Sequence, residues 1–126
     1  MNRKQPVHAY GDNPVYTQAI LVGGGDAANL TLPTDIPTKR VNAAASGTRT
    51  GEGVYSVVLA LDSAPPQVNQ TIPHCEGGDH RAEVTTAYVA STRTVVITVR
   101  NSGGTADDLP TTEKLMLLLV GRDSTS

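Results

Sequence analysis

The chain contains no phenylalanine and no tryptophan, and four tyrosines are its only large aromatic residues. Valine, leucine, isoleucine and alanine must therefore fill its core, and each of the larger ones contributes about 1.5–3 kcal/mol when fully buried. The length of 126 residues fits one domain with one core. A thin aliphatic core favours a two-layer fold that gains stability by packing against copies of itself. We therefore expect a homo-oligomer, either a dimer or a trimer.

Other absences narrow the class of protein further. One cysteine, Cys75, excludes an intrachain disulfide framework. The longest apolar run, Leu115 to Val120, is far shorter than the ~20 residues that a membrane-spanning helix needs. The first residues, MNRKQPVHAYGDNP, lack the apolar run of a secretory signal. These features predict a protein that is made in a reducing cytoplasm and does not associate with a membrane.

The charge pattern argues against a direct contact with nucleic acid. The formal net charge is −2, and the ten lysines and arginines are scattered along the chain. Binding to nucleic acid would need a basic stripe, and binding to single strands would also need aromatic side chains for base stacking. We therefore expect protein partners rather than DNA or RNA.

The clearest structural pattern lies in residues 81–101. Two runs of β-branched residues flank the pair Ser91-Thr92, and in the second run Val95, Ile97 and Val99 share one face. This period-two alternation predicts an antiparallel hairpin with one face turned to a core. The apolar run 115–120 is predicted to pair alongside this hairpin. Because that run is apolar on both faces, we expect it at the centre of a sheet or half-covered by another chain.

Shorter strand patterns occur elsewhere, separated by glycine, proline and aspartate. We expect strands at 15–22, 28–32, 54–62 and 68–72, with the last one ended by Pro73, and a polar loop at 47–53. No helical period longer than one turn emerges. The pattern predicts an all-β fold, an antiparallel β-sandwich or jelly-roll-like barrel of about six to eight strands.

The predicted organisation is one domain with two extensions. Pro6 and Pro14 block regular strand pairing at the start of the chain, so residues 1–14 are predicted to form an extended N-terminal arm. Residues 15–122 form the sandwich, and residues 123–126 form a flexible polar tail.

The densest group of reactive side chains lies between residues 74 and 80. His74, Cys75 and His80 offer the nitrogen and sulfur ligands that zinc prefers, so they are the candidate metal ligands. Their spacing matches no standard zinc pattern, and an ordinary surface loop is the alternative. A nucleophilic Cys75 activated by these histidines is a further alternative, although no oxyanion-binding motif accompanies it.

A second polar group is the oxygen-rich segment Asp107-Asp108 with Asn101 and Thr105. Such oxygens suit calcium, but the spacing of an EF-hand loop is missing, and a solvated turn is the alternative. Because a catalytic site needs several positioned acids, bases or donors, we expect a non-catalytic protein without a cofactor.

The proline-containing start of the chain, its Gly/Thr/Ala/Val-rich body and the two-faced segment LMLLLV resemble small virion proteins of tailed bacteriophages, in particular capsid decoration or cement proteins. The resemblance covers the make-up of the whole chain and includes no sequence motif. It implies a small β-rich protein that assembles in the bacterial cytoplasm, resides in the virion and clamps subunits of the major capsid protein or another virion protein. The residues expected to contact such a partner are Val7, Tyr10, Val15, Tyr16, Leu115, Leu117 and Leu119.

Two other classes stay open. One is a receptor- or glycan-binding β module of a tail fibre or surface protein, which would use loops such as 47–53 and 101–112. The other is a small metal-dependent enzyme of cupin-like shape, centred on His74, Cys75 and His80.

Overall fold

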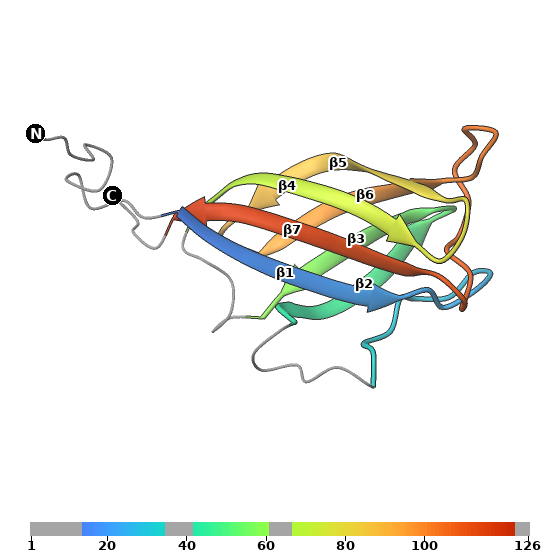
Figure 1. The fold of residues 1–126 in the computed structure, drawn as a ribbon, viewed down its shortest axis with the longest axis horizontal. Coiled ribbons are helices and arrows are strands. Elements are labelled where there is room, and N and C mark those ends of the chain that lie inside the picture. Colours follow the sequence, from blue (N-terminus) through green and yellow to red (C-terminus); the bar gives the residue numbers. More distant parts are fainter. Residues whose placement is uncertain (1–13, 35–41, 61–66, 123–126) are drawn as a thin grey trace, which may run out of the picture.

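The computed structural model describes residues 14–34, 42–60 and 67–122, and these segments contain seven β-strands (Figure 1). In chain order they are β1 (Pro14–Val22), β2 (Ala44–Gly51), β3 (Val54–Leu59), β4 (Gln67–Glu76), β5 (Arg81–Val89), β6 (Thr94–Arg100) and β7 (Lys114–Arg122). They form two antiparallel sheets with the strand orders β1-β7-β4 and β2-β3-β6-β5. The predicted all-β sandwich is confirmed.

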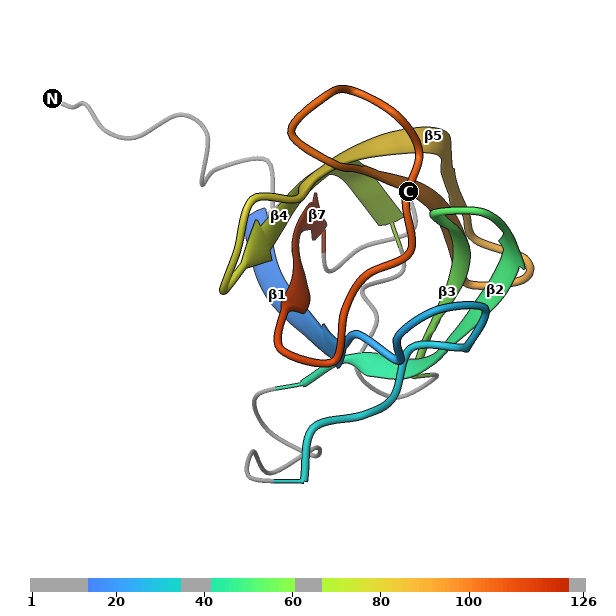
Figure 2. The same ribbon diagram turned by 90° about the vertical axis from the view of Figure 1, so that its right-hand side faces the viewer.

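The two sheets lie face to face, and seen from one end the strands surround a common interior (Figure 2). On one side, the residues before β2 join the sheets, because the backbone N–H of Ala43 donates to the carbonyl of Gln18 in β1 at 2.8 Å. The buried side chain of Asn42 also accepts from Ile20 N and donates to Ile20 O, each at 2.8 Å. The edge of β1 is therefore partly satisfied from within the chain.

The hairpin expected at residues 81–101 is present as β5 and β6. Arg81 lies opposite Arg100 in the ladder, and Val84 lies opposite Ile97. Val95, Ile97 and Val99 are fully buried, so the predicted core face is also confirmed. Two register shifts interrupt β5, between Val84 and Thr86 and between Thr86 and Val89. Irregularities of this kind are common in an edge strand, where they hinder pairing with other chains.

The prediction that residues 115–120 pair alongside the hairpin is wrong. These residues belong to β7, which lies between β1 and β4 in the other sheet. The connection of residues 101–113 carries the chain from β6 across to that sheet. The expected central position is confirmed, because β7 has a partner strand on each side, as its apolar character on both faces requires.

Two further expectations fail at polar or proline-containing edge strands. The sequence predicts a polar loop at residues 47–53, but residues 47–51 belong to β2, an edge strand whose neighbouring strand is β3. Pro73 was expected to end its strand but lies inside β4, opposite Leu117. Both strands are at sheet edges, where polar outer faces and a missing N–H are tolerated. Residues 28–32 make only isolated bridges, Val22–Thr31 and Leu30–Gly47.

The core is aliphatic, as the composition requires, and also contains one fully buried tyrosine. Tyr55 of β3 is fully buried, and its hydroxyl accepts a hydrogen bond from the backbone N–H of Leu109 at 2.8 Å. The other large side chains that are fully buried come from both sheets and from the 101–113 connection: Leu21, Leu59, Ile97, Leu109, Leu115, Leu117 and Leu119. Tyr55 therefore anchors the 101–113 connection to the four-stranded sheet.

Candidate functional site

The predicted partner-binding residues of β7 lie inside the molecule. Leu115, Leu117 and Leu119 are at most 1% exposed and pack between the chain's own two sheets. They therefore cannot contact a partner, and this part of the predicted contact set is corrected. The inward row of a central strand carries the core, while the alternate residues face outward.

The other predicted contact residues have different positions. Val7 and Tyr10 lie outside the described residues. Val15 lies in β1, opposite Gly121 of β7. Tyr16, the next residue, is 67% exposed and is the most exposed large apolar side chain of the described segments. Tyr16 is therefore accessible, and its role as a partner contact stays a prediction.

Tyr16 belongs to a group of side chains on the outside of the three-stranded sheet, which we call the outer apolar face: Tyr16, Ile72, Met116, Leu118 and Val120. Ile72 and Leu118 lie directly opposite each other in the ladder, and Tyr16 lies opposite Val120. Three of the five large apolar side chains that are exposed among the described residues belong to this face, Tyr16, Ile72 and Leu118. A cluster of this kind on one sheet is typical of a protein contact surface.

The residues around the outer apolar face are mostly uncharged. Gln18 and Gln70 lie on its two sides, opposite Leu118 and Val120, and His74 lies opposite Met116. At one end of the face, the charged residues Glu76 and Lys114 lie opposite each other. The centre of the face is therefore both apolar and free of charge.

The three predicted metal ligands do not converge. His74 and Cys75 are neighbours in β4, so their side chains point to opposite faces of the sheet, with His74 exposed and Cys75 buried. Burial, with a smaller effect of the Glu113 charge, raises the pKa of the Cys75 thiol to about 12. The thiol is therefore protonated at neutral pH, whereas a zinc ligand or a nucleophile must be a thiolate. His80 binds carboxylates of the 101–113 connection instead.

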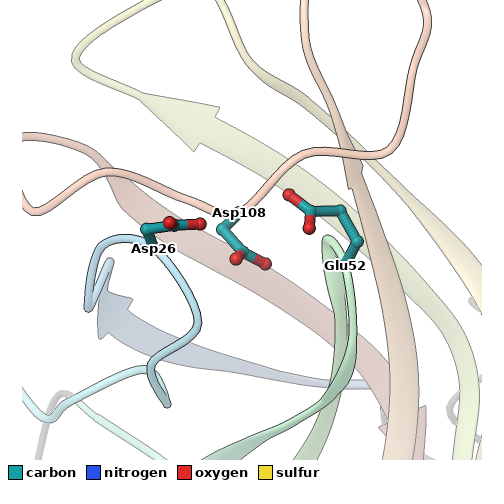
Figure 3. Close-up of side chains that lie close together, drawn as sticks. All are labelled: Asp26, Glu52 and Asp108. Carbon is teal, nitrogen blue, oxygen red and sulfur yellow. The ribbon is translucent and has the colours of Figure 1, made fainter.

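In the described segments, the one group of potential ligand atoms that converges is Asp26, Glu52 and Asp108, whose oxygens lie within 4.8 Å of one another (Figure 3). They come from the β1–β2, β2–β3 and β6–β7 connections, which meet at one end of the sandwich (Figure 2). Asp26 and Glu52 are exposed, and Asp108 is buried.

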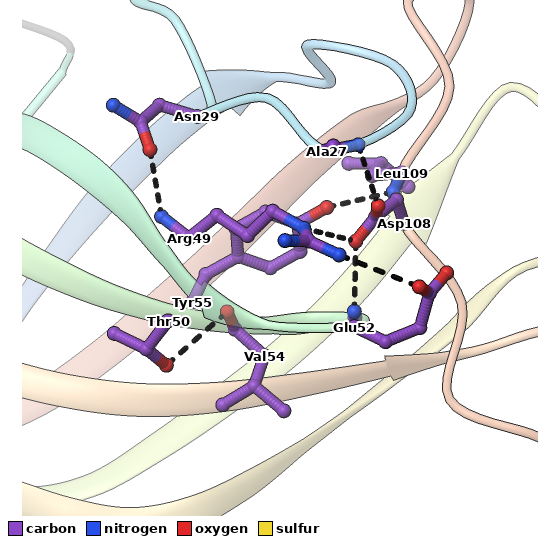
Figure 4. A network of polar contacts seen from close by, with 10 residues as sticks. Ala27, Asn29, Arg49, Thr50, Glu52, Val54, Tyr55, Asp108 and Leu109 are labelled. Atoms are coloured by element: carbon purple, nitrogen blue, oxygen red, sulfur yellow. Dashed lines mark hydrogen bonds and ion pairs between the residues drawn. The ribbon is translucent and has the colours of Figure 1, made fainter.

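The hydrogen bonds of Asp108 show that this group is a structural clamp. Its Oδ1 accepts from Arg49 Nε at 2.9 Å and from Gly53 N at 2.8 Å, and its Oδ2 accepts from Ala27 N at 2.8 Å (Figure 4). Burial alone raises the Asp108 pKa, but the bonds from Arg49, Gly53 and Ala27 outweigh it and lower this pKa to about 2. Because the guanidinium already neutralises the carboxylate, a cation would have to displace it. The residues do not fit a metal site.

The segment that the sequence suggested for calcium is also engaged internally. The side-chain oxygen of Asn101 accepts from the backbone N–H groups of Gly103 and Thr105 at 3.0 and 3.1 Å. This arrangement is a side-chain-stabilised turn, which was the alternative to calcium binding.

No family model, curated protein or solved structure matches the chain. Within the described residues, no helix has the length and apolar character needed to cross a membrane.

Proposed function

We propose that the chain is a non-catalytic structural protein of a larger particle and that copies of it associate through the outer apolar face. The observation that carries this proposal is the position of Leu118. It lies on the central strand of its sheet, between Gln18 and Ile72, and is nevertheless 39% exposed. Each aliphatic side chain of this kind stabilises a contact by about 1–2 kcal/mol when it is removed from water.

The chemistry of the face favours a second copy of the same chain as the occupant. An apolar centre is complementary to itself, and the flanking Gln18 and Gln70 amides can each donate and accept hydrogen bonds. A two-fold contact places the same patch on both partners, so no unpaired charge is buried at its centre. The charged pair Glu76 and Lys114 lies at one end of the face, where it can stay in water.

The role that we propose for this assembly is that of a capsid decoration protein of a tailed bacteriophage, bound to the major capsid protein of the virion. Support comes from the small β-sandwich, from the aliphatic composition that resembles such proteins, and from an outer sheet face suited to packing between subunits. The polar clusters at the loop end are engaged in hydrogen bonds within the chain, which agrees with a structural role.

The decoration role is tested by sedimentation with capsid shells of the phage whose genome encodes the chain. The wild-type chain is expected to pellet with the shells in a saturable manner. The variant Leu118→Lys, which places a charge in the apolar centre, is expected to show weakened binding. Val89→Lys is the matched control, because Val89 is 42% exposed but lies on β5 of the other sheet. A wild-type chain that stays in the supernatant contradicts the decoration role.

A further inference from the structure

The imidazole of His80 lies between two carboxylates of the β6–β7 connection. Its Nδ1 is 2.8 Å from Oε2 of Glu113, and its Nε2 is 2.9 Å from Oδ2 of Asp107. The His80 side chain is only 12% exposed. His80 is the last residue of the β4–β5 connection, and both connections cross from one sheet to the other at the same end. One side chain therefore joins the two crossings.

The number of protons in the cluster decides whether both contacts can be hydrogen bonds at once. A carboxylate only accepts, so a hydrogen bond on each side of the ring needs a proton at each contact, whereas a neutral imidazole carries one N–H. Hydrogen bonds at both contacts therefore require one proton more than a neutral imidazole between two carboxylates carries. In its simplest form the ring is then an imidazolium ion.

The environment of Glu113 makes this proton important for the structure. The Glu113 side chain is 6% exposed, and its Oε1 is buried without a hydrogen-bond partner in the described part of the chain. The carboxylate lies directly on the backbone of the β4–β5 connection, since a Cβ atom added to Gly78 would be 2.5 Å from Oε2. When His80 loses its charge, Glu113 remains as a buried carboxylate without a counter-charge, which is strongly unfavourable.

The charged groups that face His80 are Asp107 and Glu113. Burial lowers the His80 pKa, but the hydrogen bonds to Asp107 and Glu113, together with their charges, outweigh burial and raise it above the usual value. The other ionisable groups of the neighbouring elements do not compensate Glu113. Cys75 of β4 is a buried neutral thiol with a pKa of about 12, and the side chains of Glu76, Asp79 and Arg81 are exposed.

We propose that His80, Asp107 and Glu113 form a proton-dependent latch that closes this end of the sandwich. With the proton bound, the latch holds the β4–β5 and β6–β7 connections together. Loss of the proton at higher pH releases the two connections from each other. This inference is independent of the proposed assembly role, because none of the three residues belongs to the outer apolar face.

The test combines two nuclear magnetic resonance measurements on the full chain between pH 5.5 and 8.5. The first follows the His80 ring signals, and the expected midpoint lies above the value of about 6.5 for a free histidine. In Glu113→Gln the midpoint is expected to fall. The second measures amide hydrogen exchange at Asp107 and Glu113, whose N–H groups donate to Val99 O and Pro110 O. After correction for intrinsic exchange, protection at these amides is expected to fall about tenfold or more above the His80 midpoint.

Two histidine variants provide the comparison. His80→Gln is expected to show low protection at both amides at every pH. His74→Gln, which changes an exposed histidine of β4, is expected to reproduce the wild-type profile. If His80→Gln does not fold, the titrations of the wild type and of Glu113→Gln still test the proton-dependent latch. Protection that stays constant through the His80 midpoint, or a midpoint at or below about 6.5, overturns the latch.

Discussion

The Nε of Arg49 lies 2.9 Å from Oδ1 of Asp108, so the edge strand β2 is joined to a residue 59 positions further along the chain. The Asp108 side chain is only 3% exposed, whereas that of Arg49 is 24% exposed. The same carboxylate accepts the backbone N–H groups of Gly53 and Ala27. One buried side chain thus fixes three connections at the loop end of the sandwich.

Removal of the Asp108 carboxylate is expected to destabilise the fold strongly. In Asp108→Ala the N–H groups of Gly53 and Ala27 and the guanidinium of Arg49 lose their acceptor, and we expect the free energy of unfolding to fall by about 3 kcal/mol. Urea denaturation measures this loss. Glu52→Ala is the matched control, because the Arg49–Glu52 pair is exposed and such pairs contribute little to stability. Equal losses in the two variants would contradict the clamp.

The low pKa of Asp108 predicts that the fold loses stability in acid. Its pKa of about 2 in the folded chain is lower than the value of about 3.9 for an unfolded aspartate. Its charge therefore stabilises the fold fully above the unfolded-state value, and this contribution disappears as the pH falls through about 2. The stability difference between the wild type and Asp108→Ala should accordingly narrow from pH 5 to pH 2. A difference that stays constant over this range would show that the charge is not involved.

Substitutions of two neighbouring leucines of β7 test which face of the strand packs into the core. Leu117 is 1% exposed and Leu118 is 39% exposed. We expect Leu117→Ala to lower the free energy of unfolding by about 2–5 kcal/mol, because it leaves a cavity between the sheets. Leu118→Ala should cost less than about 1 kcal/mol when measured on the dissociated chain. Thermal or urea unfolding at low protein concentration measures both losses. A larger loss for Leu118→Ala than for Leu117→Ala would show that β7 turns its other face to the core.

Tyr55→Phe tests the anchor of the 101–113 connection. The substitution keeps the ring in the core but leaves the buried N–H of Leu109 without its acceptor at 2.8 Å. We expect a loss of about 1–3 kcal/mol in the free energy of unfolding. Hydrogen exchange at the Leu109 amide, read in the same samples, should become faster. An unchanged exchange rate at the Leu109 amide would mean that the Tyr55 hydroxyl does not stabilise the 101–113 connection.

The fold class was predictable because alternation fixes strands locally. Val95, Ile97 and Val99 fall on one face of β6, and this pattern located the strand and the face that it buries. The partner strands of β7 were not predictable, because an apolar run such as Leu115 to Val120 fits the centre of either sheet. The position of Pro73 within an edge strand was missed for a related reason, since only the sheet order shows which N–H groups need partners.

The site was less predictable because it depends on contacts between distant residues. Adjacent His74 and Cys75 looked like a cluster, yet the strand turns them to opposite faces. The sequence did not indicate the contacts of Arg49, Asp108 and Glu113, because the partners of these residues lie far away in the sequence. The oxygen-rich character of Asp107-Asp108 marked the right segment, but nothing in it indicated that Asp108 is buried and accepts hydrogen bonds from Arg49, Gly53 and Ala27.

The most direct test of the proposed assembly is the solution mass of the purified chain by light scattering over a range of concentrations. The account predicts a mass that is a multiple of the 13.1 kDa chain mass, which falls to 13.1 kDa in Leu118→Lys and is retained in Val89→Lys. A wild-type mass of 13.1 kDa at every concentration, or a Leu118→Lys variant that keeps the wild-type mass, would contradict association through the outer apolar face.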